Sequence, residues 1–198
     1  MKIIIVGATG TIGKHVTAAL QKDHEIIQVG SKSGDVQLDI TSPDAIKLFF
    51  EKIGSFDALI SATGDGHFGP LGSMTDADFR KGINSKLMGQ VNLVLQGQHH
   101  INPKGSFTLT SGILSEDPVV YGAGLSVVNA ALDGFVRGAA IELDNGVRIN
   151  AVSPGVVEDS PGYFPYFPGH IPVTMDRVTQ GYLKSALGAA TGQVFKVF

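Results

Sequence analysis

Three glycines at three-residue intervals, Gly7, Gly10 and Gly13, are the strongest signal for chemistry in this sequence. The apolar run 3–6 precedes them, and the segment 14–22, which is compatible with a helix, follows. Glycines at such a turn let the backbone approach a phosphate closely, and a following helix directs its free N–H groups at the anion. The spacing in this setting predicts a dinucleotide-binding turn, the alternative being an ordinary glycine-rich turn.

The elements that must position this turn alternate along nearly the whole chain. Strand-like apolar runs occur at 2–6, 25–29, 36–38, 58–61, 105–111, 148–153 and 193–197, and helix-compatible segments at 11–22, 43–53, 76–98, 125–143 and 173–187. Alternation of this kind is typical of βαβ units in a parallel sheet. We therefore expect an α/β fold, a single Rossmann-type, doubly wound parallel sheet of about seven strands with helices on both faces. No repeat or linker divides the chain, so 1–198 is expected to form one nucleotide-binding domain.

Composition narrows the classes of function. Hydrophobic residues make up 43% of the 198 residues and charged residues 17%, which is typical of a compact globular protein. The net charge of −3 argues against nucleic acid as a partner. The absence of cysteine excludes disulfides, thiolate zinc sites and cysteine nucleophiles, and no metal site is expected. No signal peptide or membrane-spanning segment is recognisable, so the expected location is the cytoplasm.

One segment interrupts the alternation of elements. Residues 156–172 contain four of the nine prolines and the aromatic run Tyr163-Phe-Pro-Tyr-Phe167. A long loop between ordered elements often serves as a lid over a binding site. The alternative is an aromatic loop that only packs against the body of the protein.

Several motifs together resemble the short-chain dehydrogenase/reductase family over nearly the whole chain. Besides the glycine turn, the matching segments are Asp39-Ile40, Ser61-Ala-Thr-Gly64, Ala130-Ala-Leu-Asp-Gly-Phe135, Ile141-Glu-Leu143, Val147-Arg-Ile-Asn-Ala-Val-Ser-Pro-Gly155 and Ala190-Thr-Gly-Gln-Val194. The resemblance implies a nicotinamide cofactor and the interconversion of a carbonyl and an alcohol on a small-molecule substrate.

The resemblance also implies which residues contact the cofactor. They come from the glycine turn, the pair after the third strand, the end of the fourth strand and the turn after the sixth: Gly7, Thr9, Gly10, Thr11, Ile12, Gly13, Asp39, Ile40, Ala62, Thr63, Gly64, Pro154, Gly155 and Val156.

The residues after the second strand indicate which nicotinamide is bound. A carboxylate there accepts hydrogen bonds from the ribose 2′-hydroxyl and repels a 2′-phosphate. Here the chain has Ser31, Lys32 and Ser33, and the first acid is Asp35. A lysine flanked by two hydroxyls suits a phosphate, so NADP(H) is favoured over NAD(H). The alternative is a solvated lysine on a turn.

The expected catalytic positions depart from the family pattern. Alignment of the second half places the family's usual tyrosine at Leu125 and its usual lysine at Asn129, while the usual asparagine falls on Lys86. Lysine and asparagine are thus exchanged, as they are in the ketoreductase domains of polyketide synthases. Ser111 lies close to the position of the family's serine, and neighbouring Thr110 is an alternative. Solvent exposure of Lys86 on an amphipathic helix is the other interpretation.

Leu125 cannot transfer a proton, so the proton donor must lie elsewhere. Tyr121, four residues earlier, shares a face with Leu125 only if the helix extends back through Gly122 and Gly124, which disfavour it. His67, in the loop after the fourth strand, and water are the other candidates. A tyrosine that only packs in the loop is the alternative for Tyr121.

The sequence therefore leaves two functions open, besides a purely structural role as an oligomeric scaffold. The leading hypothesis is an NADP(H)-dependent oxidoreductase with Lys86, Ser111, Asn129 and Tyr121 as its catalytic candidates and a small apolar or aromatic substrate under the lid. The alternative, which follows from the missing tyrosine, is an NADP(H)-binding sensor or regulatory protein without turnover. Under either hypothesis we expect a homodimer or homotetramer, because the helix 125–143 and the last strand are where the family self-associates.

Overall fold

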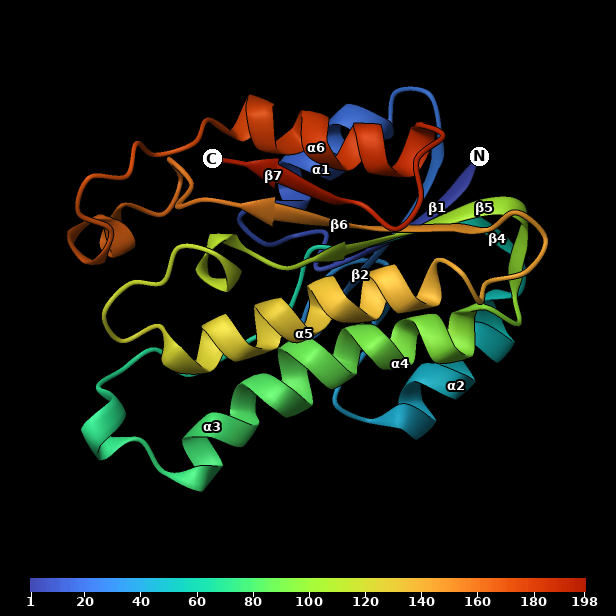
Figure 1. Cartoon of the computed structure of the whole chain (residues 1–198). Coiled ribbons are helices and arrows are strands. Elements are labelled where there is room, and N and C mark those ends of the chain that lie inside the picture. Colours follow the sequence, from blue (N-terminus) through green and yellow to red (C-terminus); the bar gives the residue numbers. More distant parts are fainter.

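The protein is described here by a computed structural model covering residues 1–198, and its centre is one seven-stranded sheet (Figure 1). The strands are β1 (Lys2–Val6), β2 (Glu25–Gly30), β3 (Val36–Gln37), β4 (Phe56–Ser61), β5 (Ile101–Thr110), β6 (Arg148–Pro154) and β7 (Val194–Val197). Their order in the sheet is β3-β2-β1-β4-β5-β6-β7, and every pairing is parallel. The predicted α/β fold class is confirmed.

Strand β1 shows why such a continuous apolar run forms the middle of the sheet. Successive side chains of a strand point to opposite faces. Ile3 and Ile5 belong to the core on one face, and Ile4 and Val6 to the core on the other. Because helices cover both faces, all four side chains are buried, as expected for a central parallel strand.

Six α-helices cover the two faces of the sheet. They are α1 (Gly13–Leu20), α2 (Pro43–Ile53), α3 (Asp76–Gly82), α4 (Met88–Gly97), α5 (Ala123–Ala139) and α6 (Met175–Leu187). Helices α1 and α6 lie side by side on one face, and α2, α4 and α5 cover the other (Figure 1). No helix is both long and apolar enough to cross a bilayer.

Two predicted helices differ from the structure in a way that matters for the site. The expected helix 76–98 is interrupted by a π-helical turn, Ile83–Leu87, between α3 and α4. The expected helix 125–143 begins two residues earlier, at Ala123, and ends at Ala139. Periodicity alone does not reveal a π turn, because one extra residue leaves the apolar pattern on either side intact.

The carboxyl ends of the strands meet at one edge of the sheet, at the left of Figure 1. Strand β1 lies between β2 and β4. The chain adds β2 and β3 on one side of β1 and then crosses over to add β4 to β7 on the other side. Ligands of doubly wound sheets bind at such a switch point. The segment 156–172, with its 3₁₀ turns at Pro161–Tyr166, lies at the same edge and is called the lid below.

Candidate functional site

Two adjoining cavities lie at the carboxyl edge of the sheet. The inner cavity has a volume of about 300 Å³ and is bounded by the ends of β4, β5 and β6, by α5 and by the lid. The outer cavity, of about 700 Å³, is bounded by the ends of β1 and β2 and by the segment after β3. Ala62, Thr63 and Gly64 line both cavities, so the end of β4 connects them.

The glycine turn is packed tightly against the end of β4. Gly7 has a φ of +83°, and a Cβ added there would lie 2.5 Å from the Ala62 carbonyl oxygen. A Cβ on Gly13 would lie 1.9 Å from the Gly7 oxygen, whereas one on Gly10 would lie 3.2 Å from the same atom. Backbone therefore occupies the places where side chains would stand, and Gly7 itself lines the outer cavity.

The residues after β2 lie beside the glycine turn. Ser31 lines the outer cavity, and the hydroxyls of Thr9 and Ser33 are joined by a 2.8 Å hydrogen bond. Lys32 is exposed and makes no ion pair. Its ammonium is therefore free to meet an anion at this end of the outer cavity.

Asp39 and Ile40 also line the outer cavity. The Asp39 carboxylate accepts hydrogen bonds from the Thr41 hydroxyl at 2.7 Å and the Thr41 N–H at 2.9 Å. The hydroxyl is the larger of the two influences that hold the pKa of this carboxyl below its usual value, so it is ionised at neutral pH. Ile40 is buried against Gly89 of α4, where a Cβ would come within 2.8 Å of the isoleucine side chain.

The inner cavity brings together three of the predicted catalytic residues, Lys86, Ser111 and Asn129. Lys86 lies in the π turn, and its Nζ donates a hydrogen bond to the Ser111 carbonyl oxygen at 2.8 Å. Burial lowers the pKa of this amine from 10.5 to about 8, although the nearby Asp133 carboxylate acts in the opposite direction. Lys86 is thus a cation in a poorly solvated place rather than the solvent-exposed lysine of the alternative interpretation.

Ser111 and Asn129 each present an unpaired polar atom. The Ser111 side chain is 1% exposed and its Oγ has no hydrogen-bond partner. Asn129 donates from Nδ2 to the Gly112 carbonyl at 3.3 Å, but its Oδ1 is buried without a partner. A buried polar atom without a partner costs about 1–3 kcal/mol. A ligand that supplied these hydrogen bonds would gain that free energy on binding.

Gln90, one helical turn beyond Lys86, is a site residue that the sequence analysis missed. Its side chain is fully buried and donates to the carbonyl oxygens of Lys86 at 3.0 Å and Thr110 at 2.9 Å. It also accepts from the Thr110 N–H at 2.8 Å. The available signal was a glutamine on the buried face of an apolar helix, which requires partners in the core.

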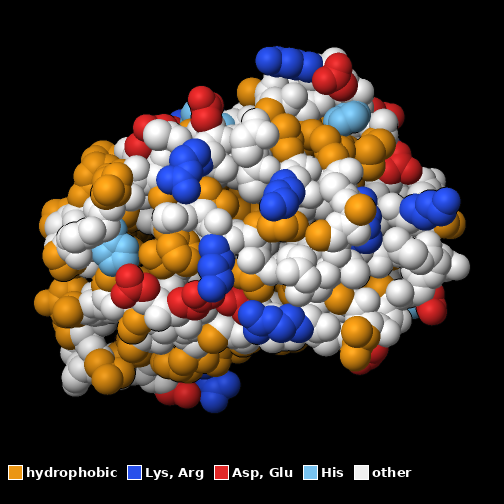
Figure 2. Space-filling model, turned by 45° about the horizontal axis from the view of Figure 1, so that its top comes forward, with side chains coloured by type: hydrophobic (Ala, Val, Ile, Leu, Met, Phe, Trp, Pro, Cys, Tyr) orange, Lys and Arg blue, Asp and Glu red, His pale blue; other side chains and the backbone are white.

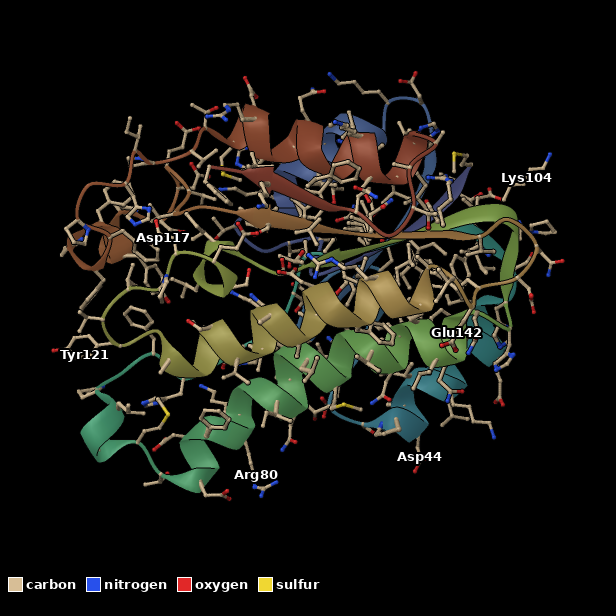
Figure 3. The ribbon with its side chains drawn as sticks, viewed as in Figure 1. Asp44, Arg80, Lys104, Asp117, Tyr121 and Glu142 are labelled. Atoms are coloured by element: carbon tan, nitrogen blue, oxygen red, sulfur yellow. The ribbon has the colours of Figure 1, made fainter.

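The turn after β6 and the lid close the inner cavity. Pro154, Gly155 and Val156, which the resemblance assigns to cofactor binding, line it together with Ser160, Tyr163 and Phe167 of the lid. The lid is attached to the body through Asp159, whose carboxylate lies 2.9 Å from both Lys14 Nζ and His15 Nε2 of α1. At its other end His170 Nε2 lies 3.6 Å from the carboxylate of Asp117, which is labelled in Figure 3.

The structure does not support Tyr121 as the proton donor. Leu125 lines the inner cavity, but Tyr121 does not. Tyr121 has a φ of +73° and therefore lies outside α5, and its exposed ring packs against Phe68 and Tyr166. Figure 3 shows it at the margin of the molecule. The phenol that does line the cavity is Tyr163, which the sequence analysis placed only in the lid.

His67 is also absent from the cavity lining. Its Nδ1 lies 3.5 Å from Asp78 Oδ1 of α3, which directs the ring toward that helix. Among the predicted cofactor residues, six line neither cavity. Five of them lie in the two loops beside the outer cavity, and Gly13 begins α1: Thr9, Gly10, Thr11, Gly13, Lys32 and Ser33.

Comparison with known proteins agrees with this geometry. Residues 5–163 match the family model described as enoyl-(acyl carrier protein) reductase, of the short-chain dehydrogenase type. The chain belongs to the short-chain dehydrogenase/reductase family. Protein lin1944 from Listeria innocua is 47% identical, with a TM-score of 0.98 over 100% of both chains. A small-chain dehydrogenase solved in complex with NADPH is 26% identical, with a TM-score of 0.89 over 100% of this chain and 96% of that one.

Curated relatives in the family are more distant. Short chain dehydrogenase/reductase AacuN from Aspergillus aculeatus is 30% identical over 66% of this chain and 52% of its own length. Hydroxynaphthalene reductase-like protein Arp2 from Metarhizium guizhouense is 26% identical over 68% of this chain and 52% of its own. The chain thus spans about half the length of these relatives.

Proposed function

We propose that this protein is an NADP(H)-dependent oxidoreductase that interconverts a small carbonyl compound and its alcohol. The observation that carries the proposal is the inner cavity, which Lys86, Ser111 and Asn129 line together. It adjoins the outer cavity, which is lined by Gly7 of the glycine turn. The names of the curated relatives contain the words reductase and dehydrogenase, which supports an oxidation–reduction reaction.

The residues fit a nicotinamide dinucleotide. The glycine turn offers backbone without side chains where a pyrophosphate needs close approach, since Cβ atoms at Gly7 and Gly13 would collide with backbone. Asp39 and Ile40 would hold the adenine ring, and Ser31, Lys32 and Ser33 a 2′-phosphate. The unpaired Ser111 and Asn129 atoms would face the nicotinamide end of the site. The NADPH complex of the 26% identical dehydrogenase supports the choice of cofactor.

The protein's own residues would then orient and polarise the substrate. When bound, a reduced nicotinamide supplies a hydride to a carbonyl carbon. Ser111 Oγ–H is free to donate a hydrogen bond to the carbonyl oxygen, and the Lys86 cation beside it stabilises negative charge that develops there. Ser111 is buried and Lys86 is half-buried, which strengthens these interactions because less water competes with them than at an exposed site.

The lining of the inner cavity favours an apolar or aromatic substrate. Ile113, Leu114, Leu125 and Val156 form much of its wall, and Phe68 and Tyr163 stand at its lid side. Figure 2 shows hydrophobic side chains gathered at the end of the molecule where the lid lies. The Arp2 relatives, named for a hydroxynaphthalene, support a flat aromatic carbonyl compound as the first substrate class to examine.

The test combines binding and turnover. Calorimetric titration with NADPH and with NADH measures cofactor binding, and a panel of aromatic and aliphatic ketones and aldehydes then measures carbonyl-dependent oxidation of NADPH. We expect tight NADPH binding, weaker NADH binding and reduction of at least one aromatic member. Binding of NADPH without reduction of any member would instead favour a sensor, for which the relatives give no support.

A homodimer or homotetramer is part of the proposal. Val127 of α5 and Leu95 of α4 are large apolar side chains that are 47% and 43% exposed. The family resemblance places self-association on the helix 125–143, and an interface there would cover Val127. Sedimentation at micromolar concentration tests this, and a monomer there would contradict it.

A further inference from the structure

The inner cavity of this family member lacks the tyrosine that its relatives use as an acid, yet it contains one charged group. Lys86 is the only residue among those lining the cavity that carries a formal charge. The other side chain with a dissociable proton is Tyr163, which is 50% exposed on the lid and packs against Phe68. Leu125, at the usual tyrosine position, offers only methyl groups.

We infer that the Lys86 ammonium itself donates the proton to the carbonyl oxygen of the substrate, a role beyond cofactor binding. The inference rests on the proposed function. In carbonyl reduction a hydride from the reduced nicotinamide bonds to the carbonyl carbon, and the π electron pair moves to the oxygen. The oxygen then takes a proton from the ammonium, which leaves a neutral amine and an alcohol. The amine regains its proton from water, and the oxidised nicotinamide is the other product.

The geometry brings the ammonium next to the residue that would bind the substrate oxygen. Lys86 Nζ lies 2.8 Å from the main-chain oxygen of Ser111, the residue whose unpaired Oγ would bind the substrate oxygen. One of the three ammonium protons satisfies the Ser111 carbonyl, so the others remain available to a substrate.

The side chain is also held in place over its length. A Cβ on Gly64 would lie 2.8 Å from Lys86 Cγ, so the lysine passes closely over the end of β4. At the helix, the Lys86 carbonyl accepts a hydrogen bond from Gln90. A donor held in this way loses little freedom when the substrate binds.

The surrounding charges suit an acid that works near neutral pH. Asp133 of α5 faces the amine and favours its protonated form, but burial is the larger influence and lowers the pKa to about 8. From the loop after β4, Asp65 is engaged by Lys81 at 2.8 Å, and from the lid only the Tyr163 phenol lines the cavity. The amine is therefore charged at neutral pH but much more acidic than a free lysine, and an acid is most effective when its pKa is near the working pH.

The decisive variant is Lys86→Arg, examined with bound NADPH. Arginine keeps a positive charge for a ribose or carbonyl but does not release a proton in this pH range. We expect NADPH affinity within about threefold of the wild type and a fall in the reduction rate of about 10²–10⁴-fold. Lys22→Arg, at an exposed lysine just beyond α1, is the matched control and should retain the rate within about threefold. Tyr163→Phe tests the rival donor, and a fall in rate there with no fall in Lys86→Arg would overturn the inference.

The pH dependence supplies the second measurement. Reduction by the wild type should fall above about pH 8, where Lys86 loses its proton, and alcohol oxidation should rise over the same range. Asp133→Asn removes a carboxylate that favours the ammonium, so both transitions should move to lower pH. A lysine-labelled sample of the NADP⁺ complex should show by NMR one amine that titrates with the same midpoint, absent in Lys86→Arg.

A rescue experiment separates donation from folding. Leu125→Tyr introduced into the Lys86→Arg protein restores a phenolic acid beside a cation, and we expect at least about 10-fold recovery of the lost rate. Retention of the wild-type rate and pH profile by Lys86→Arg would overturn the inference while leaving the proposed function intact. Failure of the wild type to bind NADPH or to reduce any carbonyl would overturn both.

Discussion

Gln90 and Thr110 are joined by two hydrogen bonds that cross from helix α4 to the end of strand β5. The Thr110 N–H donates to Gln90 Oε1 at 2.8 Å, and Gln90 Nε2 donates to the Thr110 oxygen at 2.9 Å. The side-chain amide of Gln90 thus forms the two hydrogen bonds to the Thr110 backbone that a neighbouring strand would otherwise form. Thr110 directly precedes Ser111. This pairing fixes the distance between the π turn that carries Lys86 and the strand end that carries Ser111.

Replacing Gln90 with leucine should therefore weaken both the fold and the site. Gln90→Leu leaves the Thr110 N–H and carbonyl buried without partners, which we expect to lower the free energy of unfolding by about 2–5 kcal/mol. Urea denaturation measures this change. Gln98→Leu, at the exposed end of the same helix, is the control and should cost no more than about 0.5 kcal/mol. Equal stability of the two variants would contradict the role assigned to Gln90.

Gly7→Ala tests the close approach of the glycine turn to β4. The methyl group would meet the Ala62 oxygen at 2.5 Å at a residue with a φ of +83°. We expect a loss of stability of about 1–3 kcal/mol from backbone strain and at least about 10-fold weaker NADPH binding. Thermal unfolding and calorimetry measure the two effects. Gly72→Ala, where no atom lies within 4 Å of the added methyl, should change neither.

Lys32→Ala tests the preference for the phosphorylated cofactor. A charge-assisted hydrogen bond to the 2′-phosphate would be lost, so we expect roughly 10-fold weaker NADPH binding. NADH lacks that phosphate, and its affinity should stay the same. Lys22→Ala removes an exposed lysine at the end of α1 and controls for the change in net charge. A parallel loss of affinity for both cofactors would show that Lys32 does not recognise the 2′-phosphate.

Asp159→Asn tests whether ion pairs hold the lid to the body. The carboxylate contacts Lys14 and His15. Hydrogen bonds from these two side chains lower the pKa of Asp159, and the bond from Lys14 has the larger effect. Because the pKa of Asp159 is lowered, its ion pairs contribute fully to holding the lid above pH 3.8. This contribution is lost as the pH falls through the lowered pKa. In Asp159→Asn, hydrogen exchange in residues 156–172 should be faster at neutral pH. Addition of salt to the wild type should have a smaller effect in the same direction.

Sequence patterns were sufficient for the fold and for the glycine turn, because local chemistry determines both. The alternation of apolar runs and helical segments predicted the parallel sheet, and the glycine spacing predicted the turn at the end of β1. By contrast, the π turn at Ile83–Leu87 and the buried partners of Gln90 depend on packing between elements distant in sequence. Tyr121 was better signalled, since Gly122 and Gly124 disfavour a helix through it, and its φ of +73° places it in the loop before α5.

The π turn at Ile83–Leu87 sets the relative rotation of the two helices that it joins. A π turn amounts to one residue inserted into an α-helix, which rotates the helix before it by about 100° relative to the helix after it. With that residue present, Gly82 packs against Val128 of α5 while Lys86 reaches Ser111. Deletion of a single codon in this turn would force a choice between these two contacts. The geometry of the inner cavity therefore depends on the number of residues in this turn as well as on the identity of Lys86.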